Sequence, residues 1–173
     1  MEHFTNETID ITQLPKYEEV ILTPLNTKYK AVVLLNTSFI IAVIIIGLLG
    51  VAVFAPNEIP LLSWLIIGIG VVFFAILLVI FSVWNYKKKG FAFRNHDVIY
   101  RSGIIATNTM VIPYNRVQHV ALHEGLISRY FGLAKVEIFT AGGSASDIEI
   151  PGIAKEEAEN IKQLLMGKIQ KQL

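Results

Sequence analysis

Residues 31–55 read AVVLLNTSFIIAVIIIGLLGVAVFA, residues 56–60 read PNEIP, and residues 61–84 read LLSWLIIGIGVVFFAILLVIFSVW. Neither apolar block contains a charged side chain. A helix of about 25 residues is roughly 37 Å long, which exceeds the roughly 30 Å of a bilayer's hydrocarbon core. The stretch 31–84 therefore predicts a transmembrane helical hairpin, with spans at 31–55 and 61–84.

Lysines at the ends of the hairpin predict its orientation. Lys28 and Lys30 precede the first span, Lys87–Lys89 follow the second, and the connecting loop carries only Glu58. Because Lys and Arg that flank a span remain on the cytoplasmic side, we expect a multi-pass protein of the cytoplasmic (inner) membrane with both termini in the cytoplasm. The first block is longer than the apolar core of a signal peptide and follows about thirty other residues, so an uncleaved anchor is expected.

Composition narrows the class of protein. The 173-residue chain is 53% hydrophobic, has a net charge of +1 and contains no cysteine. This length accommodates the hairpin and one small domain. The small net charge gives no reason to expect a nucleic-acid partner, and the lack of cysteine excludes disulfides and thiol nucleophiles. Since neither apolar block holds an ionisable group, an anchor is favoured over a transporter or proton relay.

The N-terminal half leaves two alternatives open. Residues 1–30 are interpreted as a partly ordered cytoplasmic segment; alternatively, Val20–Leu25 packs on the soluble domain or lies at the membrane surface. Asn36 has a depth similar to that of Ser82 and Asn85, so it either hydrogen bonds to one of them or reaches interfacial water. Four glycines permit close helix contact without a GxxxG motif: Gly47, Gly50, Gly68 and Gly70.

Residues 87–173 predict a cytoplasmic β domain that ends in a helix. Short runs rich in β-branched and aromatic residues follow one another without an intervening helical pattern, so the strands should be antiparallel. Turn residues separate them at 95–97, 102–103, 124–125 and 141–144. From Ala154 onwards, apolar residues recur at helical spacing. The apolar stripe that they form is expected to cover an open end or seam of the sheet. Its apolar members are Ala158, Ile161, Leu164, Leu165 and Ile169.

Five segments of this domain are similar to those of a known family. They are VIYRSGII (98–105), IPYNRVQHV (112–120), GLISRYFGL (125–133), TAGG (140–143) and IPGIAKEEAENI (150–161). In this order, and after a two-helix hairpin, they resemble the bacterial pleckstrin-homology-like (PH) domain family in its small membrane-anchored form. The resemblance implies a split, bent antiparallel β-barrel closed by a C-terminal α-helix, no known catalysis, and self-assembly or assembly with related membrane proteins.

The basic residues that follow the hairpin are candidates for facing the membrane and its lipids. This set consists of Lys87, Lys88, Lys89, Arg94 and Arg101. The lysines are also what the predicted topology requires, so they are not independent evidence for lipid recognition. Each basic residue near an anionic leaflet contributes about 1 kcal/mol, which suffices to orient a domain that is already tethered.

A second set is a candidate interaction surface because it lies within the segments that carry the resemblance. It consists of Arg116, Gln118, Arg129, Tyr130 and Phe131. Arg116 is expected to pair with Glu124 or Glu137 in preference to an anionic ligand. Tyr130 and Phe131 are expected to plug the end of the barrel in preference to forming an exposed partner-binding tip.

No cofactor or metal is expected, and the chain is not expected to be an enzyme. His119 and His123 have a spacing that suits zinc on a helix, but on a strand they would lie roughly 13 Å apart. The GGSAS stretch at 142–146 is interpreted as a hairpin connection, since it lacks the lysine of a phosphate-binding loop. No nucleophile motif or carboxylate pair stands out.

The leading functional hypothesis is a non-catalytic, membrane-anchored module for protein assembly or interaction. The partners would be the lipid bilayer together with a second copy of the chain or another membrane protein. The alternatives are a module that binds or is oriented by anionic lipid, and an accessory subunit of a membrane transport or export complex.

Overall fold

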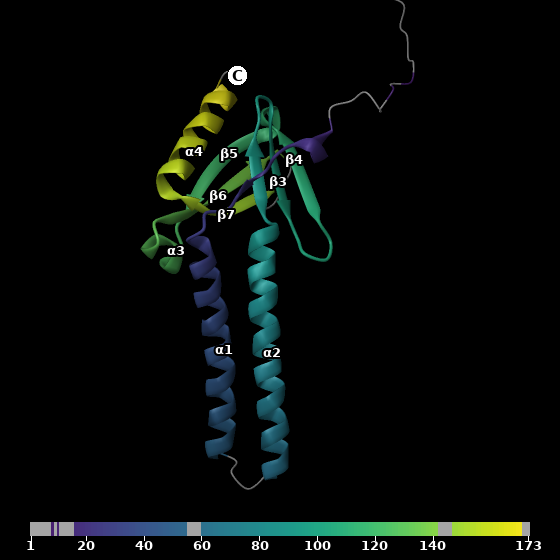
Figure 1. Ribbon diagram of the computed structural model, residues 1–173. Helices are drawn as coiled ribbons and strands as arrows, with labels where there is room; N and C mark the ends of the chain where they lie inside the picture. Colours follow the sequence, from purple (N-terminus) through teal and green to yellow (C-terminus); the bar gives the residue numbers. More distant parts are fainter. Residues whose placement is uncertain (1–7, 9, 11–15, 55–59, 142–146, 171–173) are drawn as a thin grey trace, which may run out of the picture.

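The computed structural model describes residues 8, 10, 16–54, 60–141 and 147–170. Two long helices, α1 (Tyr29–Phe54) and α2 (Leu61–Lys88), extend side by side from one end of a β domain (Figure 1). Both are long and apolar enough to cross a bilayer, and their apolar side chains are largely exposed. An exposed apolar surface of this kind is expected for a membrane hairpin.

One hydroxyl pair joins the two membrane helices near the domain. The hydroxyls of Thr37 and Ser82 hydrogen bond at 2.9 Å, and the Thr37 hydroxyl also bonds to the Val33 carbonyl at 2.9 Å. Of the two alternatives left open for Asn36, the hydrogen bond to Ser82 is therefore wrong, because Ser82 bonds to Thr37 and Asn36 is rotated about 100° around the helix from Thr37. The exposed Asn36 side chain lines a groove beside the domain instead.

The helical glycines do not bring α1 and α2 into close contact. A Cβ atom built on Gly47, Gly50, Gly68 or Gly70 would meet nothing within 4 Å. The close contact that these four glycines permit is therefore not made at these positions between α1 and α2 of one chain.

The domain consists of two antiparallel sheets. The first has the order β1 (Thr23–Pro24), β2 (Gly90–Phe93), β3 (Asp97–Ser102) and β4 (Asn108–Pro113). The second has the order β5 (Val117–His123), β6 (Leu133–Thr140) and β7 (Ile148–Ala154). Short helical turns lie at η2 (Tyr17–Glu19), η3 (Tyr114–Arg116) and α3 (Leu126–Tyr130), and α4 (Lys155–Gln170) ends the described chain.

The expected split barrel with a C-terminal helix is confirmed only in part: the sheets are antiparallel and a helix follows them, but the two sheets are not closed into a barrel. Strand β4 ends at Pro113, which has no amide hydrogen to donate, and the chain turns through η3 before β5 begins. On the other side β1 is only two residues long, and the Asn26 amide donates to the Gly152 carbonyl at 3.0 Å. The result is two packed sheets with a single hydrogen-bonded contact at this seam in the described residues.

The N-terminal segment is part of the domain where it approaches the membrane. Thr23 and Pro24 pair with Phe91 and Gly90, and Leu25 is 3% exposed in the core. Of the alternatives for Val20–Leu25, packing on the domain is therefore confirmed for residues 23–25. A two-residue strand is too short to show any periodicity in the sequence.

The core lies between the sheets and under α4. Residues 135–138 alternate between charged and apolar side chains, which predicts a strand with one buried face. Val136 and Ile138 are fully buried whereas Lys135 and Glu137 are only half-buried, which confirms this alternation along β6. Helix α4 contributes Ala158 and Leu165 to the core, and Ile161 and Ile169 pack against it. Leu164 is 47% exposed, so it does not widen the buried stripe as expected.

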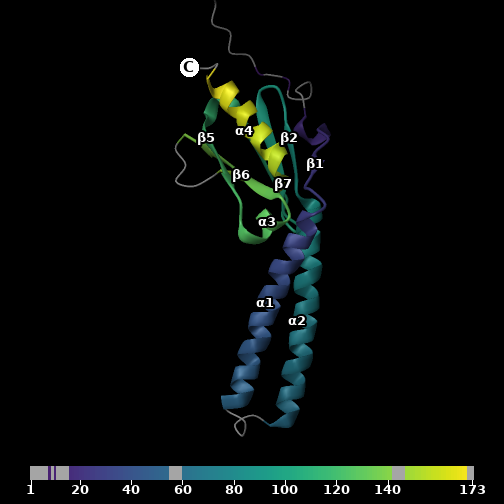
Figure 2. The ribbon, with the colours of Figure 1, turned by 90° about the vertical axis from the view of Figure 1, so that its left-hand side faces the viewer.

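The antiparallel order places successive connections at alternate ends of the domain. The β2–β3 turn lies at the end away from the hairpin, where the Lys168 ammonium near the end of α4 donates to the Asn95 carbonyl at 3.2 Å. The β3–β4 loop, α3 and the start of α4 lie beside the hairpin (Figure 1), and Figure 2 shows α3 next to the first turns of α1. We call the end of the domain away from the hairpin the distal end, and the end beside the hairpin the membrane end.

Candidate functional site

Four of the five predicted membrane-facing basic residues line one cavity at the membrane end. The cavity has a volume of about 330 Å³ and lies where α2 leaves the membrane. It is lined by Leu22, Pro24, Lys87, Lys88, Lys89, Gly90, Arg101, Gly103 and Thr107. We call it the basic cavity.

Three separate parts of the chain form the walls of the basic cavity. Helix α2 ends at Lys88, and Lys89 has extended backbone angles that lead into β2. Strand β1 brings Leu22 so close that a Cβ on Gly90 would lie 3.0 Å from the Leu22 Cβ. Gly103 has a φ of +106°, which turns the chain out of β3 beneath Arg101 at little steric cost. The cavity therefore depends on the N-terminal segment that sequence patterns left undecided.

All charged groups that line the basic cavity are positive. Arg101 is held in place because its Nε donates to the Thr109 hydroxyl at 3.3 Å. Burial lowers the pKa of Lys89, and the nearby Glu149 carboxylate opposes this shift. Cationic groups that converge without a carboxylate in the lining are suited to bind an anion.

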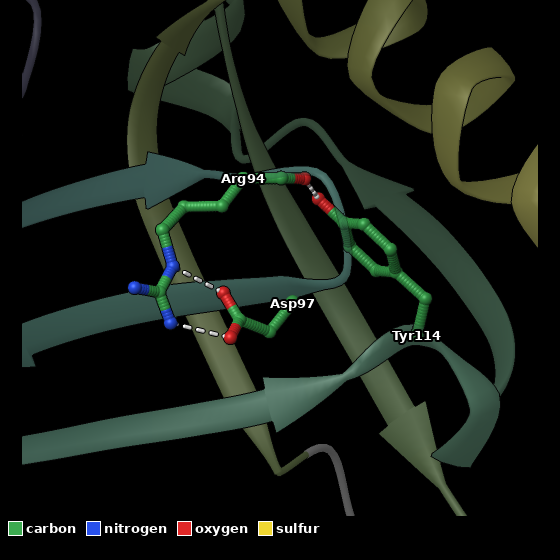
Figure 3. Close-up of polar contacts among 3 residues, drawn as sticks. All are labelled: Arg94, Asp97 and Tyr114. Atoms are coloured by element: carbon green, nitrogen blue, oxygen red, sulfur yellow. Dashed lines mark hydrogen bonds and ion pairs between the residues drawn. The ribbon is translucent and has the colours of Figure 1, made fainter. Parts of the chain in front are cut away.

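Arg94 does not belong to this cluster. Its Nε donates to Asp97 Oδ1 at 2.6 Å and its second guanidinium nitrogen contacts the other carboxylate oxygen (Figure 3). The Tyr114 hydroxyl donates to the Arg94 carbonyl at 2.6 Å, and burial raises the pKa of Tyr114 to about 12. These contacts stabilise the β2–β3 turn at the distal end, far from the membrane.

The second predicted set is divided between the two ends of the domain. Arg116 and Gln118 are exposed near the distal end, where the Ala141 amide donates to the Arg116 carbonyl at 3.2 Å. Arg129, Tyr130 and Phe131 lie at the membrane end on and beside α3. The five residues therefore do not form one surface.

The expected ion pairs of Arg116 are not formed. Glu124 pairs with Lys155 at 2.8 Å and Glu137 with Lys135 at 2.6 Å. Among the described residues, no ion pair includes Arg116. Arg116 is therefore an exposed cation near the distal end.

The barrel plug expected from Tyr130 and Phe131 is wrong for Tyr130. Its side chain is 87% exposed, while Phe131 is half-buried and packs edge-on against Tyr130 with ring centroids 5.4 Å apart. Tyr130 is the last residue of a short helix, α3, and Phe131 follows it directly; the sequence pattern did not separate this helix from a loop.

A second cavity, which sequence analysis missed, lies between α1 and α3. This α1–α3 groove has a volume of about 630 Å³ and is mostly apolar. It is lined by Val32, Leu35, Asn36, Phe39, Gly125, Leu126, Ile127 and Ser128. Only the contact between a membrane helix and a domain helix creates it, so neither segment alone could indicate it.

The two histidines with a spacing of four residues lie on a strand, as the sequence predicted. His119 and His123 are both on β5, and the His119 ring stacks on Phe139 with centroids 4.1 Å apart. The described residues contain no group of three or more His, Cys, Asp or Glu side chains that could hold a metal ion. The GGSAS stretch at 142–146 lies outside the described residues.

Comparison with known proteins gives matches for most of the chain. The family model described as bacterial PH domain matches residues 20–169, which include β1, the hairpin and the domain. The UPF0699 transmembrane protein YdbS of Bacillus subtilis (strain 168) is 33% identical over 99 residues, which cover 57% of this chain and 57% of that protein. The UPF0699 transmembrane protein YdbT of the same organism is 30% identical over 103 residues, which cover 59% of this chain but 20% of that protein. No solved structure matches the chain.

Proposed function

The chain belongs to the bacterial PH domain family, and we propose that it is a non-catalytic membrane module whose basic cavity binds the headgroup of an anionic lipid. Its similarity to transmembrane proteins and its two candidate spans make it a membrane protein. The pairing of β1 with β2 requires the residues on both sides of the hairpin to share one side of the bilayer. We assign this side to the cytoplasm of the inner membrane, because lysines flank both spans there.

The observation that carries the proposal is the convergence of Lys87, Lys88, Lys89 and Arg101 on one cavity at the membrane exit of α2. Three consecutive lysines would follow a span for topological reasons alone. The topology does not require Arg101, since this residue lies on β3 and pairs in register with Gly90. A strand arginine directed to the same cavity as the lysines favours ligand binding, and the closest abundant anions are lipid phosphates.

The test compares lipid retention by the full-length protein in native mass spectrometry after extraction in a mild detergent. Phosphatidylglycerol should be retained in preference to phosphatidylcholine. Removing one cation near the headgroup costs about 1 kcal/mol, so Arg101→Gln should weaken retention about fivefold. Arg116→Gln is the matched control, because it removes the same charge from the distal end. Equal retention of the two lipids, or equal effects of the two variants, would contradict the proposal.

Assembly with a second copy or with another membrane protein is the second candidate, and the open faces of the hairpin favour it. An apolar groove of about 280 Å³ remains between α1 and α2, with Trp64, Gly68 and Val72 among its lining residues. Small residues at an unfilled groove allow another helix to approach closely. An accessory role in a transport or export complex would use the same surface. A single homo-oligomeric or heteromeric mass in the same spectra would support this candidate, and a bare monomer would contradict it.

A further inference from the structure

The membrane end of the domain carries unusually exposed apolar side chains. Among the described large apolar residues of 90–170, Leu126 is 92%, Ile105 is 91% and Tyr130 is 87% exposed, and the next is Leu164 at 47%. In water such side chains forfeit the free energy of burial. Ile21, which is similarly exposed, belongs to the N-terminal segment.

These three side chains lie on the two sides of the membrane hairpin. Ile105 is in the β3–β4 loop, whose Gly103 and Thr107 line the basic cavity at the end of α2. Leu126 and Tyr130 are on α3, which contacts α1 (Figure 1). We call Ile105 and the α3 pair the two apolar tips.

The α3 tip is continuous with a lipid-facing surface. The α1–α3 groove has Leu126 on one wall, and Leu35 and Phe39 of α1, which are 47% and 69% exposed, on the other. From Val32 to Phe39 the groove follows about 10 Å of a membrane helix. The groove therefore joins the α3 tip to the exposed apolar surface of a membrane helix.

The polar groups near the tips suit the bilayer interface. Tyr130 has a hydroxyl at the end of an apolar ring, and Arg129 beside it is exposed and can extend its guanidinium towards the headgroups. On the other side, Lys87 and Lys88 line the same cavity as Gly103 and Thr107, which belong to the loop that carries Ile105. Apolar side chains bordered by cations are typical of segments that insert into an interface.

We propose that both apolar tips insert into the bilayer leaflet beside the hairpin, so that the domain rests on the membrane at two points. Insertion of apolar side chains needs no anionic headgroup. The inference therefore goes beyond the function proposed for the basic cavity and can fail or succeed independently of it.

The absence of cysteine permits a direct measurement on the full-length chain. Ile105→Cys and Leu126→Cys, each labelled with an environment-sensitive fluorophore, are reconstituted in vesicles of phosphatidylcholine alone. Lipid-attached nitroxides in the acyl region should strongly quench the emission at both positions. His96→Cys is the matched control, because His96 is exposed in the β2–β3 turn at the distal end, and it should lose little emission.

Two outcomes would overturn the proposal. In the first, lipid-attached quenchers act no more on positions 105 and 126 than on position 96, which would place the tips in water. In the second, the labels at the tips are protected from both lipid-attached and aqueous quenchers, and this protection appears only when the protein-to-lipid ratio is raised. Such a result would show that a second copy of the chain covers the tips. Because these vesicles contain no anionic lipid, neither outcome tests the basic cavity.

Discussion

Gly152 of β7 lies directly against the ring of Tyr29, the first residue of α1. A Cβ atom on Gly152 would lie 2.3 Å from the Tyr29 Cγ, and Gly152 has a φ of +67°. The Asn26 amide donates to the Gly152 carbonyl at 3.0 Å, and the Tyr29 ring lies 6.2 Å from that of Tyr86 on α2. One glycine therefore joins the second sheet to the base of both membrane helices.

Gly152→Ala should destabilise the protein by about 2–4 kcal/mol, the sum of left-handed backbone strain and displacement of the Tyr29 ring. Gly132→Ala is the matched control. Gly132 also has a φ of +67°, but an added Cβ meets nothing within 4 Å, so only the strain of about 1 kcal/mol should appear. Thermal unfolding of the full-length chain in detergent measures the loss of stability in each variant. Equal losses in the two variants would show that the contact with Tyr29 contributes nothing.

The Thr37–Ser82 hydrogen bond should stabilise the hairpin modestly. Hydrogen bonds between membrane helices average about 0.6 kcal/mol, so a double-mutant cycle of Thr37→Val and Ser82→Ala should give a coupling energy of that order. Asn36→Leu, which depth matching alone would expect to loosen the hairpin, should leave its thermostability in detergent nearly unchanged. A larger loss for Asn36→Leu than for Thr37→Val would contradict this assignment.

The elements that the sequence predicted well are those whose signal lies within one continuous segment. The uncharged blocks 31–55 and 61–84 are each long enough to predict a membrane helix. The alternation along β6 and the helical spacing of α4 likewise predict which side chains are buried. Leu164, which is exposed, shows that the edge of the apolar stripe of α4 is predicted less well.

The remaining features depend on contacts between segments that are distant in the sequence. Matching residues by depth gives their level in the bilayer but not their direction around the helix, which is why Thr37 and not Asn36 meets Ser82. The basic cavity needs β1 as a wall, and the α1–α3 groove needs a domain helix against a membrane helix. The charge pairs were mispredicted for a related reason: Lys155 on α4 and Lys135 on β6 occupy the carboxylates expected for Arg116.

Single cysteines can test whether the N-terminal segment and the domain lie on the same side of the membrane. A membrane-impermeant maleimide applied to intact cells should label Leu61→Cys, in the first turn of α2, and should label Thr27→Cys and Glu159→Cys only after permeabilisation. Labelling of Thr27→Cys and Glu159→Cys on opposite sides would contradict the β1–β2 pairing. Labelling of both from outside would preserve that pairing but reverse the orientation predicted from the lysines.

Two buried phenols should make the domain sensitive to alkali. Tyr100 is 7% and Tyr114 is 2% exposed, and burial raises the pKa of each to about 12 from its ordinary value of 10.0. The folded state therefore retains protons that the unfolded chain releases above pH 10, so this contribution is fully present below that pH and is lost as the pH rises towards 12. Two pKa units correspond to at most about 3 kcal/mol for each phenol.

The alkaline unfolding midpoint of the full-length chain, followed by circular dichroism and phenolate absorbance, measures this loss. Tyr114→Phe should lower stability at neutral pH by about 1 kcal/mol, because the hydroxyl that donates to the Arg94 carbonyl is removed, yet it should flatten the decline above pH 10. Tyr17→Phe, which changes an exposed phenol of the N-terminal segment, should alter neither quantity. If Tyr114→Phe and the unmodified chain lose stability in parallel above pH 10, the decline arises from other groups and the assignment to Tyr114 is wrong.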